Sequence, residues 1–153
     1  MALPESKLIR GEIVLRDMQL TSEVRMTRRS LVRWVALAMG LISSNESRTA
    51  VIDILDSLFY FQFKSKDPSV PELLARIKKR GGKVGEKALR YHLWQMKKDG
   101  WVESSKGRYR FFVPPLADKH DVSASIEGVM RGRSEVAIAK VKEALKSLKH
   151  TYK

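Results

Sequence analysis

The stretch of residues 87–112, KALRYHLWQMKKDGWVESSKGRYRFF, decides the fold, because its periodicity changes halfway along. Apolar residues first recur at helical spacing and form one stripe: Leu89, Leu93 and Met96. This spacing predicts a helix over about residues 86–98, which Gly100 ends. Apolar and polar residues then alternate on either side of a second glycine, and this alternation predicts a β-hairpin.

The predicted hairpin turns at residues 104–107, a run of Ser, Ser, Lys and Gly. Beyond the turn, Tyr109, Phe111 and Val113 alternate along one face of the second strand, so we expect them to point inward. A pair of prolines follows and ends this strand.

Three further helices are expected before this stretch. The first begins at Thr27 or Ser30 and stops at Gly40, and the second lies in the aromatic segment RTAVIDILDSLFYFQFK. The third begins with a capping box, in which Ser69 and Glu72 each satisfy a free amide of the first turn. The elements therefore follow one another along the chain in the order helix, helix, tight glycine turn, helix, hairpin.

The N-terminal end of the chain has only a weak secondary-structure pattern, whereas the C-terminal end has a clear one. Residues 12–17 have the alternation of a short strand, and residues 116–133 have no clear pattern. The last segment, SEVAIAKVKEALKSLKHTYK, is an amphipathic helix. Its apolar positions are spaced three, four and three residues apart, as at a coiled-coil seam: Ile138, Val141, Leu145 and Leu148. This seam is either a dimer interface or part of an intramolecular core.

The composition bounds the classes of partner. The chain of 153 residues has a net charge of +13, which attracts nucleic acid or an anionic membrane face. Residues 76–110 hold twelve lysines and arginines against three acids, a difference of +9. The absence of cysteine excludes a disulfide framework and thiolate metal ligands. No apolar run approaches the ~20 residues of a membrane span, and no signal peptide is evident, so we expect a cytoplasmic protein without membrane contact.

The order of elements is that of a winged helix-turn-helix, an α+β fold that is mainly α, with extra N- and C-terminal helices here. The stretch VGEKALRYHLWQMKKDGWV resembles the recognition helix of winged-helix repressors of the arsenic-resistance and multiple-antibiotic-resistance types. The resemblance rests on a small cap, a His-Leu pair, and a glycine followed by two apolar residues: Gly85, His92, Leu93, Gly100, Trp101 and Val102. The chain as a whole is similar to basic winged-helix transcription regulators of archaea.

The resemblance covers about residues 47–115, and we expect the chain to have three parts. Residues 1–43 form an N-terminal extension with one helix, residues 44–115 the winged helix-turn-helix domain, and residues 116–153 a segment with the amphipathic, possible dimerisation helix. One position departs from the family: Gly85 stands where Ser or Thr usually caps the recognition helix, at a cost of a few tenths of a kcal/mol.

The outward residues of the recognition helix are the candidate DNA contacts. The inward stripe leaves five residues outward: Lys87, Arg90, Tyr91, Trp94 and Lys98. Arg90 suits a bidentate contact with guanine, and Lys87 with Lys83 suits phosphates. The resemblance also implies a contact at Glu86. On the wing, the candidates are Lys106 at the tip and two arginines on one strand: Arg108 and Arg110.

The resemblance implies sequence-specific binding of double-stranded DNA by a homodimeric transcription regulator, with two recognition helices in major grooves ~34 Å apart. One alternative is an RNA- or ribosome-associated basic module. RNA readers usually expose stacking aromatic rings, whereas Tyr109 and Phe111 are expected to point inward. Another alternative is an adaptor that docks on transcription machinery through Trp94 and the aromatic helix.

Several residues also have plainer interpretations. Trp94 is either a stacking surface or packs on the N-terminal helix or a partner, and His92 borders the core. The glycines of RGGKVG lack the spacing of a phosphate loop and fit a turn. DKHD, residues 118–121, fits a polar loop better than a metal site, and the aromatic helix fits core packing better than an effector pocket. No catalytic constellation is evident, so we expect no enzyme, metal or cofactor.

Overall fold

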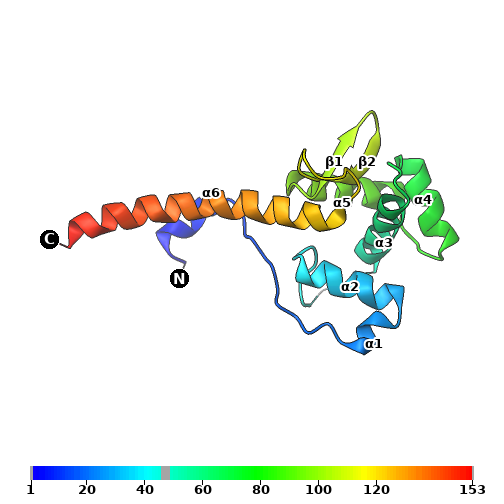
Figure 1. Cartoon of the computed structure of the whole chain (residues 1–153), viewed down its shortest axis with the longest axis horizontal. Helices are drawn as coiled ribbons and strands as arrows, with labels where there is room; N and C mark the ends of the chain where they lie inside the picture. The colour runs from blue at the N-terminus through cyan, green and yellow to red at the C-terminus, as the bar shows by residue number, and fades with distance from the viewer. Residues whose placement is uncertain (1, 46–48, 153) are drawn as a thin grey trace.

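A computed structural model of the chain describes residues 2–45 and 49–152 (Figure 1). In chain order its elements are η1 (Pro4–Leu8), α1 (Ser22–Arg25), α2 (Arg28–Ala38), α3 (Ala50–Phe63), α4 (Val70–Lys79), α5 (Glu86–Lys98), β1 (Val102–Ser105), β2 (Arg108–Phe111) and α6 (Val122–Thr151). This order confirms the predicted fold class: a mainly helical α+β winged helix-turn-helix with extra helices at both ends.

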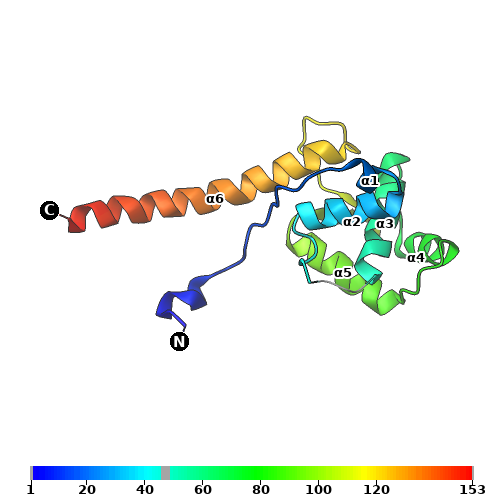
Figure 2. The same cartoon turned by 90° about the horizontal axis from the view of Figure 1, so that it is seen from below.

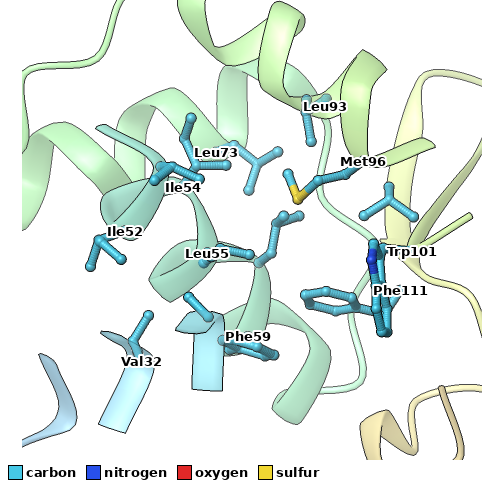
Figure 3. Close-up of a cluster of buried hydrophobic side chains, with 14 of the residues drawn as sticks. Val32, Ile52, Ile54, Leu55, Phe59, Leu73, Leu93, Met96, Trp101 and Phe111 are labelled. Carbon is cyan, nitrogen blue, oxygen red and sulfur yellow. The ribbon is translucent and has the colours of Figure 1, made fainter. Parts of the chain in front are cut away.

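Helix α3 lies at the centre of the hydrophobic core. It packs against α2 on one side and against α4, α5 and β2 on the others (Figure 3). The stripe predicted for α5 is buried in this core, with Leu89 and Leu93 fully inaccessible to solvent. Trp101, directly after the turn that ends α5, is also buried, and the stacked rings of Phe59 and Phe111 join α3 to the hairpin. The core therefore fixes which face of α5 is left outward.

The ends of the helices follow the predicted signals. The Thr27 hydroxyl accepts a hydrogen bond from the backbone N–H of Ser30, so Thr27 is the N-cap of α2. The capping box of α4 is complete: Ser69 Oγ accepts from the Glu72 N–H, and the Glu72 carboxylate accepts from the Ser69 N–H. Gly100 has a φ of 86°, which lets the chain leave α5 in the left-handed region.

The wing is a tight antiparallel hairpin. Val102 pairs with Phe111, and Ser105 pairs with Arg108. Lys106 and Gly107 have φ values of 53° and 76°, which is the conformation of a type I′ turn. The turn is therefore two residues long, and the prediction that it included the two preceding serines was wrong, because both pair within β1.

The predicted strand at residues 12–17 is absent from the described structure. This segment is instead an extended strap that crosses the C-terminal end of α2. The backbone N–H of Arg16 donates to the Ala38 carbonyl at 2.8 Å, and its guanidinium donates to the carbonyls of Leu37 and Ile42. The strap lies against the end of α2 rather than against β1 or β2, and it satisfies free carbonyls at the end of the helix.

Helix α6 is longer than the amphipathic segment predicted for it. It begins at Val122, where the Asp121 carboxylate accepts from the Ser123 N–H, and thus takes in much of the segment that had no clear pattern. Its first turns pack on the core through Val129 and its neighbours, and the rest of the helix projects away from the body (Figures 1 and 2). Among the described residues, no helix is both long and apolar enough to cross a membrane. The predicted division of the chain into three parts stays a prediction.

Candidate nucleic-acid interface

The outward face of α5 is open to solvent along its whole length. All the predicted contacts on this helix and the loop before it are exposed: Lys83, Glu86, Lys87, Arg90, Tyr91, Trp94 and Lys98. The opposite face of the same helix is buried in the core. The helix is thus held rigidly from behind while its polar and aromatic side chains face outward, which is the arrangement that a groove-reading helix needs.

Two aromatic rings form a step on this face. Tyr91 and Trp94 are 54% and 57% exposed, and their ring centroids lie 6.3 Å apart. The Lys98 ammonium lies 5.3 Å from the centroid of the Trp94 ring, a cation–π contact. Trp94 therefore does not pack on α2, one of the roles that the sequence left open for it.

Arg90 has a partner on its own helix. Its Nε lies 3.3 Å from a carboxylate oxygen of Glu86, one turn earlier, and both side chains are more than half exposed. An exposed pair of this kind contributes only about 0.3–0.5 kcal/mol. Arg90 can therefore give up its ion pair with Glu86 and bind a base edge at little cost in free energy. Before a base edge is bound, Glu86 orients the guanidinium.

A basic run directly precedes α5. Lys78 and Lys79 in the last turn of α4, with Arg80 after it, are exposed and lead into the loop that carries Lys83. These three charges contribute to the +9 of residues 76–110 but are not among the contacts predicted from the sequence. The run of three consecutive basic residues before a glycine turn was the signal that could have identified them.

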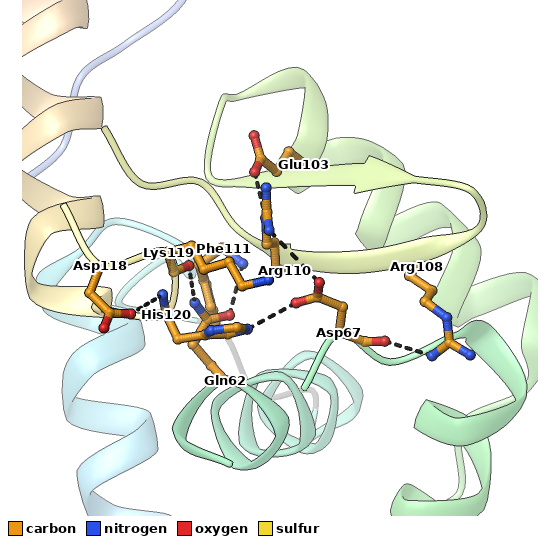
Figure 4. A network of polar contacts seen from close by, with 9 residues as sticks. All are labelled: Gln62, Asp67, Glu103, Arg108, Arg110, Phe111, Asp118, Lys119 and His120. Carbon is orange, nitrogen blue, oxygen red and sulfur yellow. Dashed lines mark hydrogen bonds and ion pairs between the residues drawn. The ribbon is translucent and has the colours of Figure 1, made fainter. Parts of the chain in front are cut away.

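The wing presents its charges unequally. Lys106 at the tip of the turn is exposed. Arg108 donates from Nη1 to the Asp67 carbonyl at 2.8 Å and to the Glu72 carboxylate at 3.0 Å. Arg110 donates from Nε to the Glu103 carboxylate at 2.6 Å, and it is only 31% exposed (Figure 4). Both arginines already have anionic or carbonyl partners within the chain, although the Arg108 side chain is still 56% exposed. The wing therefore presents Lys106 at its tip, with Arg108 partly exposed beside it.

Asp67 and Gln62 connect the wing to the body. The Asp67 carboxylate lies 3.8 Å from the Arg110 guanidinium and 3.1 Å from His120 Nε2. The buried Gln62 amide accepts a hydrogen bond from the Phe111 N–H and donates to the Lys119 carbonyl (Figure 4). The hairpin is therefore bonded to α3 through Gln62 and to the loop after α3 through Asp67, and these two residues also contact the loop before α6.

The remaining polar motifs make contacts within the chain. His92 is half-buried beside the ring of Tyr91, with centroids 5.5 Å apart. In the DKHD loop, His120 contacts Asp67, and its N–H donates to the Asp118 carboxylate. The described residues contain no cluster of three potential metal ligands. Gly81, with a φ of 85°, ends α4, in keeping with the turn expected in the glycine run.

The aromatic helix α3 contributes to the core and also to an open cleft. Phe59 is buried, whereas Phe63 near the end of the helix is largely exposed. A cleft of about 720 Å³ lies between α2, α3 and the start of α6, and it is lined mainly by apolar side chains such as Val35 and Ile126.

The predicted dimer seam is exposed on the projecting part of α6. Ile138, Val141, Leu145 and Leu148 all lie beyond the last turn that packs on the core. The structure therefore does not bury these side chains in an intramolecular core, and the dimer interface stays a prediction.

Comparison with known proteins identifies one related domain. A family model described as the ribonuclease R winged-helix domain matches residues 62–110, about a third of the chain. The match begins at the end of α3 and runs through α4, α5 and the hairpin, which includes the outward face of α5 and the wing. No curated protein and no solved structure matches the chain. Residues 62–110 are thus similar to the winged-helix domain of a ribonuclease.

Proposed function

We propose that this protein binds duplex DNA through α5 and the tip of the wing, and that it acts as a homodimeric, cytoplasmic transcription regulator without catalytic activity. The observation that carries the proposal is the two-sided character of α5, where Leu89 and Leu93 are fully buried and the basic face is fully open. A helix of this kind fits the major groove, and its outward side chains meet base edges.

The exposed side chains suggest a division of roles. Arg90 is the candidate for a bidentate contact with guanine, since its link to Glu86 is weak and exposed. Lys87 and Lys83 lie at the start of α5, where they suit phosphate oxygens. Lys106 would contact the backbone or the adjacent minor groove. We assign Arg108 and Arg110 mainly to holding the hairpin in place, since their partners lie within the chain.

RNA is the second candidate ligand, and two observations favour it. The matching domain family is named for a ribonuclease. The exposed rings of Tyr91 and Trp94 offer a surface on which an unpaired base can stack. The hairpin argues against RNA, because Phe111 is fully buried and Tyr109 half-buried, so the sheet presents no open aromatic platform. An adaptor role has less support, because the exposed rings of α5 stand among lysines.

The decisive experiment is a binding selection from random duplexes in the presence of structured RNA, at two salt concentrations. Enrichment of a palindromic duplex motif would support the proposal, whereas preferential retention of RNA would overturn it. If a dimer neutralises roughly six to ten phosphates, its affinity should fall by ~10³–10⁵ between 50 and 200 mM salt.

Two substitutions then separate base contacts from phosphate contacts. Arg90→Ala should relax specificity at one base position by about 1–3 kcal/mol. Lys106→Ala should weaken binding to all duplexes alike and lower the salt slope by about one. Lys146→Ala, on the projecting part of α6, is the matched control for loss of one exposed positive charge. If neither Arg90→Ala nor Lys106→Ala differs from this control, α5 does not enter the groove.

A further inference from the structure

The outer part of α6 is a helix without a partner in its own chain. Every residue from 135 to 152 is exposed, and between described residues the last hydrogen bond from α6 to the rest of the chain runs from the Arg133 guanidinium to the Glu12 carbonyl. Isolated helices of about 15 residues are marginal in water, and most helices in proteins are stabilised by packing of an apolar face. This part of α6 therefore needs a partner surface to stabilise it as a helix.

One continuous apolar stripe runs along this outer part. Its members are spaced three, four, three and four residues apart and are 46–78% exposed: Ile138, Val141, Leu145, Leu148 and Tyr152. This is the spacing of the two core positions of a coiled-coil heptad. A helix with the same stripe is the partner that fits it, and a second copy of this chain supplies one.

The two flanks of the stripe differ in charge. Glu135, Lys142 and Lys149 lie on one flank, which is basic along the stripe itself, and Ala137, Ala144 and Thr151 lie on the other. In a parallel pair, the lysine flank of one helix meets the alanine flank of its partner. In an antiparallel pair, like flanks meet, so lysines of the two helices face each other and repel. The flanks therefore favour the parallel orientation.

We infer that α6 pairs in parallel with α6 of a second copy, an inference that rests on the proposed homodimer and specifies its geometry. The helix contacts its own body through Val122, Ile126 and Val129. At ~100° per residue, this face lies roughly 110° around the helix from the stripe. A two-fold axis along the helix pair thus places the two bodies on opposite sides of it, without overlap, and both at the N-terminal end of α6.

The parallel arrangement has a consequence for recognition. Both α5 helices lie near the same end of the α6 pair, so they can reach neighbouring half-sites on one duplex. In an antiparallel pair, the bodies would stand at opposite ends of helices ~45 Å long, estimated from 1.5 Å per residue.

The chain contains no cysteine, so single cysteines report directly on the orientation. In a parallel pair every stripe position faces its own copy, so both V141C and L148C should form disulfide-linked dimers in a glutathione redox buffer. An antiparallel pair allows self-pairing at one position near its axis at most, because these two sites are ~10 Å apart along the helix. The control is E143C, which lies on the opposite face of α6.

We expect V141C and L148C each to give roughly ten-fold more covalent dimer than E143C, because a disulfide requires Cα atoms within ~4.4–6.8 Å. Dimer from one variant alone, dimer from neither, or a V141C–L148C heterodimer in excess of both homodimers would overturn the parallel pairing. Circular dichroism of each variant confirms that α6 is folded.

Duplex binding by the same variants under reducing conditions distinguishes this inference from the proposed function. Cross-linking at both positions without any duplex binding would uphold the parallel pair and overturn only the proposed function. Duplex binding without cross-linking would overturn only the parallel pair.

Discussion

The buried amide of Gln62 joins the wing to α3, and its replacement by leucine tests how strongly. Gln62 is 1% exposed. Its Oε1 accepts from the Phe111 N–H at 3.1 Å, and its Nε2 donates to the Lys119 carbonyl at 3.4 Å. Gln62→Leu retains a side chain of similar size with high helix propensity and removes both hydrogen bonds.

The two lost bonds differ in cost. The Phe111 N–H is buried, and without its acceptor it pays the full desolvation penalty of about 1–3 kcal/mol. The bond to Lys119 is long and only partly buried, so that carbonyl can turn to water at little cost. We therefore expect a loss of about 1–3 kcal/mol in the free energy of unfolding. For a chain of this length, each kcal/mol lowers Tm by about 2–4 °C.

Thermal and urea unfolding followed by circular dichroism measure this loss, and amide exchange locates it. The Phe111 amide should lose protection more than amides in the middle of α5. Gln95→Leu, at an exposed position on α5, is the matched control and should change stability by less than about 0.5 kcal/mol. A Gln62→Leu protein with a wild-type midpoint and a protected Phe111 amide would refute this reasoning.

Three further perturbations test other parts of the fold. Ser69→Ala removes the capping box and should lower the free energy of urea unfolding by about 0.5–2 kcal/mol. The pKa of Glu72 lies below its ordinary 4.5. The main cause is the hydrogen bond from the Ser69 backbone N–H, followed by the Ser69 side chain and the Arg108 guanidinium. This stabilisation is present above pH 4.5 and is lost as pH falls through the folded value, so the gap between the wild-type and Ser69→Ala midpoints should narrow in acid. The gap should not close, because the bond from the Glu72 N–H to Ser69 Oγ does not depend on pH. Gly40→Ala should destabilise more than Gly81→Ala in thermal melts: both have positive φ, but a Cβ at Gly40 would lie 2.6 Å from the strap. Arg108→Gln should lower Tm slightly and leave duplex affinity in a mobility-shift assay nearly unchanged, because its guanidinium is held by the body.

The parts of the fold that depend on local spacing could be predicted from the sequence. The buried stripe of α5, the capping box at Ser69 and the stop at Gly100 each involve residues within about one or two turns of one another. The outward set of α5 followed directly, because a helix with one buried face has only one face to offer. The exposure of Lys87 and Arg90 thus follows from the burial of the stripe on the opposite face of α5.

The parts that depend on contacts between distant residues could not be predicted. Arg108 meets the Asp67 carbonyl across 41 positions, and Arg133 meets the Glu12 carbonyl across 121. No local pattern encodes either pairing. The strap at residues 12–17 alternates like a strand, but a strand also needs a free edge beside it, and that depends on the packing of the whole body.

Contacts between distant residues also lower the net charge of the candidate interface. Counted along the sequence, residues 76–110 carry a difference of +9. Three carboxylates from earlier in the chain lie against arginines of this region: Asp56, Asp67 and Glu72. They reduce the difference from +9 to about +6. Asp67 and Glu72 lie against the two arginines of the wing strand, Asp56 lies against Arg76 on α4, and none of the three lies against α5. With a slope of about −0.9 per phosphate, the salt dependence should thus correspond to at most about six phosphates per protomer. The attraction for nucleic acid is therefore concentrated on α5, the basic run before it and Lys106.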